Sequence, residues 1–435
     1  MKNDVPDRGA VDSRFRGNDG GEAKSKQRML FISHRIPYPP DRGEKIRGWN
    51  MIQHLGRKYK LHYGCLVDDP ADWQHLPRLR ALCEDFVAFG IDKRWQKLRA
   101  LLHFRPGRPL MLDYYHHAGL FRWARETLAR ERVDIVYIFS TAMAPYVLHH
   151  QGPRRILDMQ DVDSEKWSEY AKRSRWPMRA VWAHEGRTLL AYERQAAIAC
   201  ERTLLVSAPE CRRFAELVPE VRDRVNWLEQ GVDLDRFSPA AALDNPYPDP
   251  APRLVFTGNM DYWPNADAAI FFAREVMPLL RNRHPAPRFV VVGANPTAEV
   301  SALAALPDVE VTGRVADVRP YVAHAAVSVA PLRLARGIQN KVLEAMALAR
   351  PVVASPQAFE GVRAEAGRDL LVGDGAAELA RLVGEVLDGA HPGIATNGRR
   401  AVESGYSWAG VLEKLDRLLE APQQAGAGQR MEATA

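Results

Sequence analysis

The sequence predicts an α/β protein composed of two doubly wound domains, each built on a parallel β-sheet. The chain has 435 residues, which is more than one ordinary hydrophobic core accommodates, so two domains fit its length better. Short apolar segments of strand length alternate with helical stretches in two separate runs, a pattern typical of parallel sheets covered by helices on both faces. Residues 241–252 (AALDNPYPDPAP) separate the two runs and contain four prolines, which indicates a linker.

The composition predicts a cytoplasmic protein without a membrane span. Hydrophobic residues make up 46% and charged residues 26% of the chain, as in soluble globular proteins. No apolar run reaches the roughly 18 residues that a bilayer-spanning helix needs, and no signal-peptide core precedes Met29. The four cysteines show neither a CxxC pair nor metal-ligand spacing, which favours reduced thiols. Residues 1–28 are polar and Gly-rich, and we expect a disordered tail there, with Met29 as an alternative start.

The first domain is expected over residues 29–240. Its strand candidates are residues 29–33, 61–67, 85–91, 134–140, 155–160, 203–207 and 225–230. Its longest helical pattern runs from about Ser164 to Cys200, with a break expected at Pro177.

The second domain is expected over residues 252–420. Its strand candidates are residues 253–258, 288–293, 309–313, 326–332, 351–355 and 369–373. A final helix over residues 406–420 is expected to cross back onto the first domain, and residues 421–435 read as a second disordered tail.

Ligands of parallel α/β sheets bind beyond the carboxyl ends of the strands, so the loops that follow the strands hold the candidate site. The first such loop covers residues 33–48, where three prolines precede Gly43 and a helix is expected to begin near Glu44. The free N–H groups of that helix end favour an anion, with His34 close by. A plain Pro-rich turn remains the alternative.

The second loop covers residues 333–350, where a Gly-containing segment leads into a helix. Lys341 lies three residues and Asn340 four residues before Glu344, so they share one face of that helix. A cation beside free N–H groups suits a diphosphate, and a carboxylate suits ribose hydroxyls. An ordinary surface Lys–Glu pair is the alternative interpretation.

The third loop, residues 158–167, places Asp158, Asp161 and Asp163 at the end of a strand. We expect Asp161 to contact the acceptor and Asp163, with Ser164, to cap the following helix. No metal site is predicted, because DxD-like spacing alone is weak.

Several strings resemble glycosyltransferase family 4, whose members have the GT-B fold. The most specific are KVLEAMALARPVVAS (341–355) and FEG (359–361). The wider pattern resembles the sugar transferases of PEP-CTERM/exosortase exopolysaccharide systems, over residues 29 to about 410. The strings that carry it are SHRIPYPPDRGEKIRGWN (33–50), LDMQDVDSEKW (157–167), SAPE (207–210), GVDLDRFSP (231–239), FTGNMDYWPNADA (256–268) and ARGIQNKVLEAMA (335–347).

The resemblance implies a GT-B architecture: two Rossmann-like domains facing a cleft, the first for the acceptor and the second for the nucleotide-sugar. Glu344 matches the second glutamate of the family's paired-glutamate motif and is expected to bind the ribose. The first glutamate is replaced by Arg336, and the loop after the first strand of the second domain (258–264) lacks the family's Arg and Lys. Lys341, with Arg333 or Arg336, must then supply the positive charge.

The expected site residues follow from the loops and the resemblance together. Lys341 and Asp161 are the catalytic candidates. Donor contacts are expected from Gly258, Asn259, Arg314, Arg336, Gly337, Asn340 and Glu344, and acceptor or phosphate contacts from Gly43 and His34. The expected activity is retaining transfer of a sugar to a lipid-linked saccharide in exopolysaccharide biosynthesis, with neither metal nor cofactor. A sugar-nucleotide epimerase of the same fold and a non-catalytic sugar- or nucleotide-binding component are the alternatives.

The net charge of +6 is unevenly spread along the chain. Residues 92–108 and 172–187 carry Lys and Arg interleaved with Trp, Leu, Met and Phe, a pattern typical of amphipathic helices. We expect peripheral attachment of the first domain to an anionic membrane surface through these stretches. Helix faces that only cover the core are the alternative. Nucleic-acid binding is not expected, because no stacking-aromatic motif accompanies the basic stretches.

Overall fold

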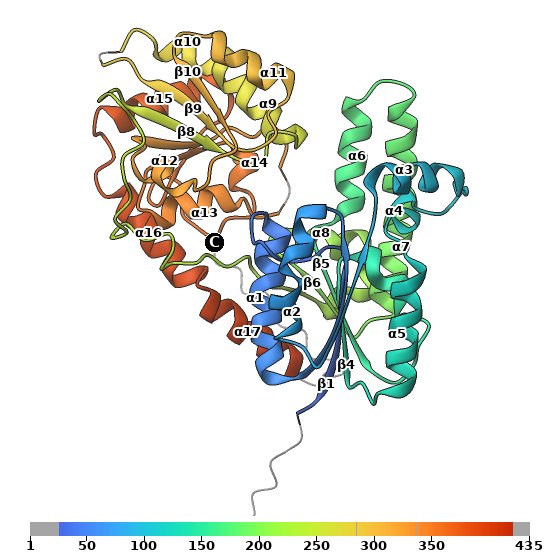
Figure 1. The fold of residues 1–435 in the computed structure, drawn as a ribbon. Coiled ribbons are helices and arrows are strands. Elements are labelled where there is room, and N and C mark those ends of the chain that lie inside the picture. The colour runs from blue at the N-terminus through green and yellow to red at the C-terminus, as the bar shows by residue number, and fades with distance from the viewer. Residues whose placement is uncertain (1–25, 284, 336, 421–435) are drawn as a thin grey trace, which may run out of the picture.

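The computed structural model describes residues 26–420 except residues 284 and 336 (Figure 1). The predicted tails over residues 1–28 and 421–435 lie outside this part, apart from residues 26–28. The first strand, β1 (Arg28–Ser33), begins at the last residue assigned to the N-terminal tail.

The N-terminal domain contains a seven-stranded parallel sheet in the order β3-β2-β1-β4-β5-β6-β7. Its strands are β1 (Arg28–Ser33), β2 (Lys60–Val67), β3 (Asp85–Gly90), β4 (Ile135–Phe139), β5 (Arg154–Gln160), β6 (Arg202–Leu205) and β7 (Val225–Trp227). Its helices are α1 (Gly43–Lys58), α2 (Leu76–Arg80), α3 (Lys93–Leu102), α4 (Leu110–Tyr114), α5 (Ala118–Arg130), α6 (Asp163–Arg173), α7 (Met178–Ile198) and α8 (Ala208–Leu217), with 3₁₀ turns at Pro70–His75, Thr141–Tyr146 and Pro219–Arg224. The expected helix break is present between α6 and α7.

The C-terminal domain contains a six-stranded parallel sheet in the order β10-β9-β8-β11-β12-β13. Its strands are β8 (Arg253–Thr257), β9 (Arg288–Val292), β10 (Val309–Gly313), β11 (Val327–Ala330), β12 (Val352–Ala354) and β13 (Leu371–Val372). Its helices are α9 (Trp263–Phe271), α10 (Met277–Leu280), α11 (Ala298–Ser301), α12 (Arg319–Ala323), α13 (Asn340–Ala347), α14 (Pro356–Phe359), α15 (Gly375–Leu387), α16 (Ile394–Gly405) and α17 (Trp408–Glu420), with a π-helical segment at Phe272–Val276 and a 3₁₀ turn at Ala302–Ala305. The predicted fold class, two doubly wound parallel-sheet domains, is therefore confirmed.

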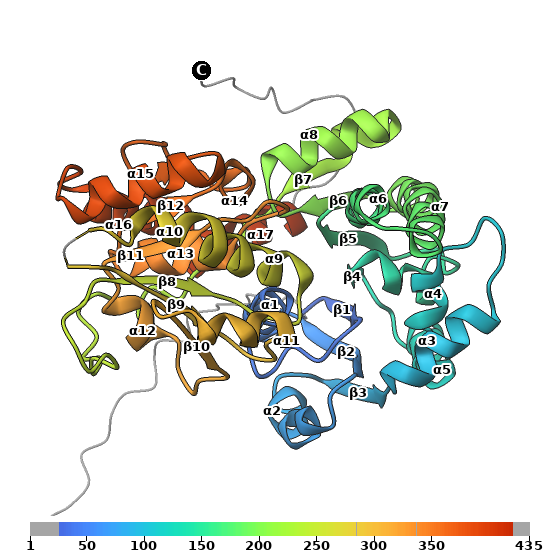
Figure 2. The ribbon, with the colours of Figure 1, turned by 90° about the horizontal axis from the view of Figure 1, so that it is seen from above.

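Alternation along β1 shows why both faces of the first sheet are covered. Met29 and Phe31 pack in one hydrophobic cluster with residues of α1, whereas Leu30 and Ile32 pack in another with residues of α5. Successive side chains of a strand point to opposite faces, so a continuous apolar strand needs helices on both sides. Figure 2 shows the helices of each domain on both sides of its sheet.

The strand orders place one switch point in each sheet, between β1 and β4 in the first and between β8 and β11 in the second. Loops on either side of a switch point diverge and leave a crevice, which is where ligands of open α/β sheets bind. Of the three loops that the sequence singled out, those after β1 and β11 border the switch points, whereas the third, residues 158–167, follows β5, next to β4.

The domain boundary lies earlier than the linker predicted over residues 241–252. Val232, Phe237 and Tyr247 belong to the hydrophobic core of the C-terminal domain, and the Tyr247 hydroxyl donates to the Tyr321 carbonyl. The chain therefore enters the second core near residue 232, before the predicted first-domain end at residue 240. Prolines indicate irregular backbone, but this irregular segment packs against the core of the C-terminal domain through Tyr247.

Helix α17 returns from the C-terminal domain to the N-terminal domain, as Figure 1 shows. Val411, Leu415 and Leu419 join the hydrophobic cluster that contains residues of β1 and α1. The Asp416 carboxylate lies 2.8 Å from His54 Nε2 on α1. The two domains are thus joined by two crossings of the chain.

Candidate active site between the two domains

The N-terminal ends of α1 and α13 meet across the cleft. A side chain added to Gly43, the first residue of α1, would begin 3.4 Å from the side-chain nitrogen of Asn340, the first residue of α13. The first N–H groups of a helix lack intrahelical acceptors and carry a partial positive charge. Two such ends brought together, one from each domain, form a place that favours an anion.

Lys341 follows directly on α13. Its ammonium donates to the Asn265 side-chain oxygen at 2.9 Å and lies 5.1 Å from the ring centre of Phe256. Burial lowers the pKa of Lys341 to about 8, against the opposing attraction of Glu344. The lysine is thus a part-buried cation whose hydrogen-bonding partner is neutral.

Glu344 lies one turn further along α13. Burial raises the pKa of this carboxyl to about 7, although the positive charges of Lys341 and Arg236 oppose the rise. In the described part of the chain, the Glu344 side chain has neither a hydrogen bond nor an ion pair. Glu344 is part-buried, and a desolvated carboxylate without a partner is costly. Such groups are frequent where a ligand supplies the partner.

Asp161 reaches the C-terminal domain from the end of β5. A side chain on Gly337 would begin 2.0 Å from Asp161 Oδ1, so the carboxylate lies directly against the glycine backbone. Gly337 has φ +63°, a conformation that glycine adopts without strain. Burial, followed by the charges of Glu210 and Asp163, raises the pKa of Asp161 to about 7, and its Oδ1 has no hydrogen-bond partner.

The other two aspartates of this loop have structural roles that differ from the prediction. Asp158 is fully buried and accepts two hydrogen bonds, at 3.0 and 3.2 Å, from the guanidinium of Arg47 on α1. It therefore faces the core and not the cleft, as expected for a charge that is paired when buried.

The expected capping of α6 by Asp163 and Ser164 is wrong. The cap residue is Val162, and its side chain makes no capping bond. Glu210 accepts from the Val162 N–H at 3.0 Å, and Glu193 accepts from the Ser164 N–H at 3.1 Å. Carboxylates from α8 and α7 thus occupy the end of α6 that local sequence reasoning assigned to its own side chains.

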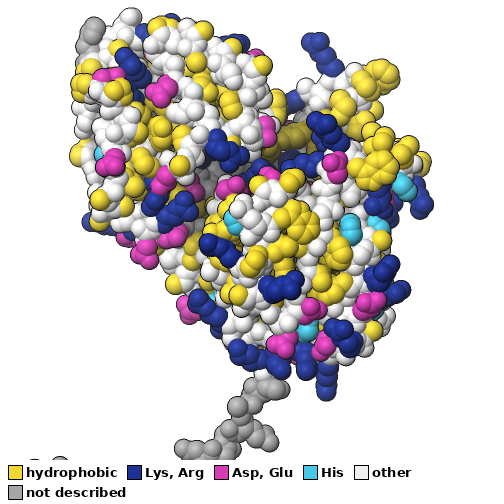
Figure 3. Space-filling view, in the orientation of Figure 1, with side chains coloured by type: hydrophobic (Ala, Val, Ile, Leu, Met, Phe, Trp, Pro, Cys, Tyr) yellow, Lys and Arg dark blue, Asp and Glu magenta, His cyan; other side chains and the backbone are white. Residues whose placement is uncertain are grey.

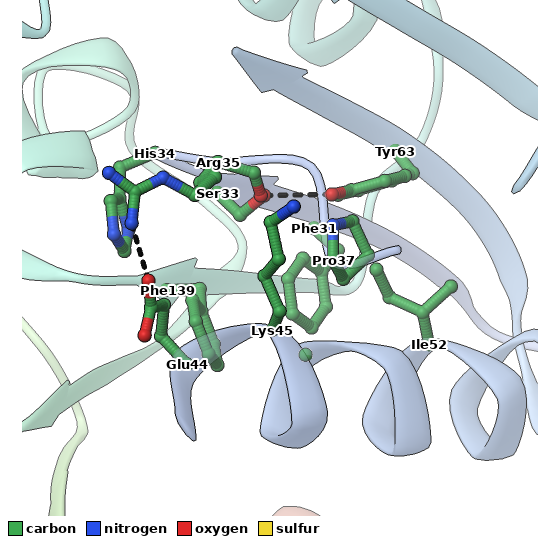
Figure 4. A pocket seen from close by; sticks show the side chains of 11 residues that line it. Phe31, Ser33, His34, Arg35, Pro37, Glu44, Lys45, Ile52, Tyr63 and Phe139 are labelled. Atoms are coloured by element: carbon green, nitrogen blue, oxygen red, sulfur yellow. Dashed lines mark hydrogen bonds and ion pairs between the residues drawn. The ribbon is translucent and has the colours of Figure 1, made fainter. Parts of the chain in front are cut away.

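The loop after β1 is held by ion pairs, of which Figure 4 shows the one between Arg35 and Glu44. Arg35 bridges the Glu44 carboxylate of α1 and Asp68, and the Arg35 to Asp68 distance is 2.9 Å. Burial and the positive charge of Arg35 lower the pKa of His34 to about 4, so its ring is neutral at physiological pH. His34 therefore adds no positive charge for a diphosphate. Next to it, Phe31, Ser33 and Lys45 line a cavity of about 10 Å³, the size of one water.

The remaining predicted donor residues occupy different positions. Gly258 and Asn259 lie at the switch point after β8, and the Asn259 carbonyl accepts from the Asn265 side chain at 3.0 Å. Arg314 is exposed and follows β10, the edge strand, two strands away from β8. Arg333 pairs with Asp267, with one contact of 2.9 Å, and Arg336 lies outside the described residues.

An aromatic contact across the cleft was missed from the sequence. Tyr170 on α6 lies edge-on to Trp263, with ring centres 5.7 Å apart. The Lys166 ammonium lies over the ring of Trp167 and over that of Tyr262, 5.6 and 5.8 Å from their centres. Aromatic spacing on a helix would ordinarily indicate core packing, and only the tertiary structure shows that these rings connect the domains.

Glu229 is a second connection, at the crossing of the chain between the domains. Its carboxylate accepts from the Lys414 ammonium of α17 at 2.8 Å and from the Arg363 guanidinium of the C-terminal domain at 2.8 Å. The indole of Trp227 donates to it as well, at 2.8 Å. Three donors on one buried carboxylate hold the two crossings together.

One protein-family description matches this chain. Residues 251–389 match "Glycosyl transferases group 1", which covers the sheet of the C-terminal domain and α13. No curated protein matches significantly.

Solved structures show the same two-domain arrangement. Anabaena Alr3699/HepE in complex with UDP has a TM-score of 0.63 and 13% identity, with 90% of this chain and 99% of that chain covered. Sucrose-phosphate synthase from Thermosynechococcus elongatus has a TM-score of 0.66 and 16% identity, with 91% and 98% covered. WaaG, a glycosyltransferase involved in lipopolysaccharide biosynthesis, has a TM-score of 0.63 and 14% identity, with 90% and 100% covered.

Identities this low show the fold, which is the GT-B architecture expected from the sequence. The matched C-terminal segment and this fold together support an enzyme of the glycosyltransferase class. In the part of the chain that the structure describes, no three His, Cys, Asp or Glu side chains lie together as a metal site. The chemistry that the cleft offers is electrostatic: two helix ends and a part-buried lysine for an anion, and two carboxylates of raised pKa for hydroxyl groups or protons.

Proposed function

We propose that the protein is a retaining glycosyltransferase that uses a nucleoside diphosphate sugar as its donor. The observation that carries this proposal is the meeting of the α1 and α13 helix ends, with Lys341 and Glu344 one turn apart at the switch point of the second sheet. Lys341 and the helix N-termini would bind the diphosphate, and Glu344 would accept hydrogen bonds from the ribose. Solved structures of HepE contain UDP and UDP-glucose, which makes uridine nucleotides the first donors to test.

In this mechanism the protein stabilises the leaving diphosphate while the acceptor hydroxyl attacks the same face of the sugar. The negative charge that develops on the leaving group lies beside donors that are already oriented, and such preorganisation lowers the barrier without reorganisation of solvent. Asp161, against Gly337, would orient the acceptor hydroxyl. Contacts between α6 and the loop 258–263 would exclude water, since an open cleft would hydrolyse the donor.

The donor assignment is tested by a thermal-shift panel of UDP, ADP, GDP and dTDP. A nucleotide that binds the native state raises the unfolding temperature by mass action. Incubation of the stabilising nucleotide's sugar derivative without acceptor then separates enzyme classes: an epimerase converts the donor alone, whereas a transferase needs an acceptor. If none of the four nucleotides raised the unfolding temperature, the proposal would be contradicted.

We further propose that the acceptor is a lipid-linked saccharide of exopolysaccharide assembly, met at the inner face of the cytoplasmic membrane. The sequence resemblance supports the pathway, and a surface of the N-terminal domain supports the location. No helix in the described residues is long and apolar enough to cross a bilayer.

The surface in question combines α3 with the turn between α6 and α7. Trp176 is 83% exposed in that turn and Leu102 is 70% exposed on α3, and Arg94 and Lys97 are exposed beside them. The two stretches are connected in space, because the ring of Phe104 packs 4.8 Å from that of His184 on α7. Figure 3 shows hydrophobic side chains among Lys and Arg on this part of the molecule.

Co-sedimentation with vesicles tests the membrane surface. Binding should require an anionic lipid such as phosphatidylglycerol and weaken as salt rises, because each Lys or Arg near the surface contributes on the order of 1 kcal/mol. The variant Arg94→Gln, Lys97→Gln, Trp176→Ala should sediment less than wild type. Arg212→Gln, Arg222→Gln neutralises two other exposed arginines of the same domain and should not change binding. Binding that is indifferent to lipid charge would overturn this part of the proposal alone.

A further inference from the structure

Asn265 lies at the centre of the donor side of the cleft, although its sequence context gives it no role. It is on the first turn of α9, and only 7% of its surface is exposed. Its side-chain nitrogen donates to the Asn259 carbonyl at 3.0 Å, and its oxygen accepts from the Lys341 ammonium at 2.9 Å. The amide thus links the loop after β8 to the first turn of α13.

The close approach of this amide explains the glycine at the end of β8. A side chain on Gly258 would begin 2.7 Å from the Asn265 nitrogen, which is closer than such atoms come. Gly258 therefore leaves the space in which the Asn265 amide lies. The loop, α9 and α13 are fixed relative to one another through a single neutral side chain.

The neutrality of Asn265 matters for the charge on Lys341. An ammonium has three N–H donors, and in the described structure only one of them is used, on Asn265. No carboxylate of the described residues lies within ion-pair distance of Lys341, whereas Arg333 is paired with Asp267. Lys341 therefore has no carboxylate in contact to neutralise it when it is protonated, and it keeps two donors for a ligand.

We propose that Asn265 is a positioning residue, which holds Lys341 as an unneutralised cation at the N-terminus of α13 for the diphosphate of the donor. This inference rests on the proposed donor site. An aspartate of the same shape would hold the ammonium equally well but would cancel its charge. The side-chain amide is therefore required for its charge as well as for its geometry.

The pH dependence of nucleotide binding reports on the same contact. Lys341 has a pKa lowered to about 8 by burial, and the groups around it are Glu344 on its own helix, Asn265 on α9 and the Phe256 ring on β8. A lysine binds an anion only while it is protonated, so affinity is present below this pKa and falls as the pH rises through it. An anionic neighbour would raise the pKa of Lys341, and loss of the amide acceptor would lower it further.

The experiment is calorimetric titration of the full-length protein with UDP, and with uridine in parallel, from about pH 6.5 to about pH 9.5. This range includes the pKa of Lys341. The variants are Asn265→Asp and Asn265→Ala. The matched control is Asn245→Asp, which makes the same change of charge at an exposed position. Asn245 accepts from the Tyr247 N–H through its side-chain oxygen, and an aspartate keeps that bond.

At pH 7, Asn265→Asp should weaken UDP binding about tenfold and Asn265→Ala about threefold, with uridine affinity and the control unchanged. The alkaline fall in UDP affinity should move to higher pH in Asn265→Asp and to lower pH in Asn265→Ala. Equal losses in both variants with an unchanged pH profile would show that Asn265 only shapes the loop, and would overturn the inference while leaving the donor site in place. Failure of wild type to bind any of UDP, ADP, GDP and dTDP would overturn the proposed function itself.

Discussion

Replacement of Glu344 by glutamine should make the free protein more stable and its nucleotide complex weaker. The Glu344 carboxylate is part-buried on α13 without a hydrogen-bond or ion-pair partner in the described structure, and glutamine has nearly the same shape without the charge. The folded protein therefore carries the cost of desolvating this charge, and a bound ribose would offset it by donating hydrogen bonds.

The size of the stabilisation follows from the pKa of Glu344, which burial raises from 4.5 to about 7. Each tenfold change in proton affinity corresponds to about 1.4 kcal/mol. At a pH above both pKa values, the ionised carboxylate therefore destabilises the fold by about 3 kcal/mol. The cost accumulates as the pH rises from about 4.5 to about 7, because over this range the unfolded chain ionises before the folded one. This destabilisation is about 1 kcal/mol at pH 5 and reaches its full size by pH 8.

Urea unfolding of the ligand-free protein at pH 5 and pH 8 measures this difference. The stability advantage of Glu344→Gln over wild type should be about 2 kcal/mol larger at pH 8 than at pH 5. Titration with UDP at pH 8 should show about tenfold weaker binding. Glu360→Gln removes an exposed carboxylate close by in sequence and should show neither effect. An advantage that is equal at the two pH values would refute the reasoning, because it would mean that Glu344 titrates normally in the folded protein.

Two further outcomes are expected. Lys341→Gln should reduce turnover with the nucleotide-sugar more than it reduces binding of the bare nucleoside. Kinetics and calorimetry on the same variant would check this, and equal losses would place Lys341 away from the diphosphate. Glu229→Ala should destabilise the protein by about 3 kcal/mol in urea unfolding, because it leaves Lys414 and Arg363 without their buried carboxylate. A change below about 1 kcal/mol would show that this contact adds little to the stability of the fold.

The architecture could be predicted because its determinants are local. Each of the thirteen strand candidates coincides with a strand of one of the two sheets, since apolar strands buried on both faces read as short hydrophobic runs between helical patterns. The break at Pro177 was predictable from the missing N–H of proline. The position of the domain crossing near Val232 was not, because burial of Phe237 and Tyr247 in the second core depends on side chains that are distant in sequence.

The site was predictable only as far as loops and helix ends determine it. The helix starts at Gly43 and Asn340 carry recognisable signals, and the strand order brings them together. Asn265 carried no such signal, because a polar residue on the first turn of a helix is ordinary. Its function depends on Lys341, which is 76 residues further along the chain. For the same reason the sequence could not show that Asp158 pairs with Arg47 and not with a ligand.

The distribution of buried charges separates structural groups from functional ones in this fold. Arg47 and Asp158, both fully buried, satisfy each other with two hydrogen bonds. Lys341, Glu344 and Asp161 are part-buried without an opposite charge in contact, and their pKa values move toward the neutral form in each case. Where the two domains and two helix N-termini meet, the fold therefore carries the cost of charges that it leaves without an opposite charge. The missing partners are those that a nucleotide-sugar and an acceptor hydroxyl would bring: phosphate oxygens for the lysine and hydroxyl donors for the carboxylates.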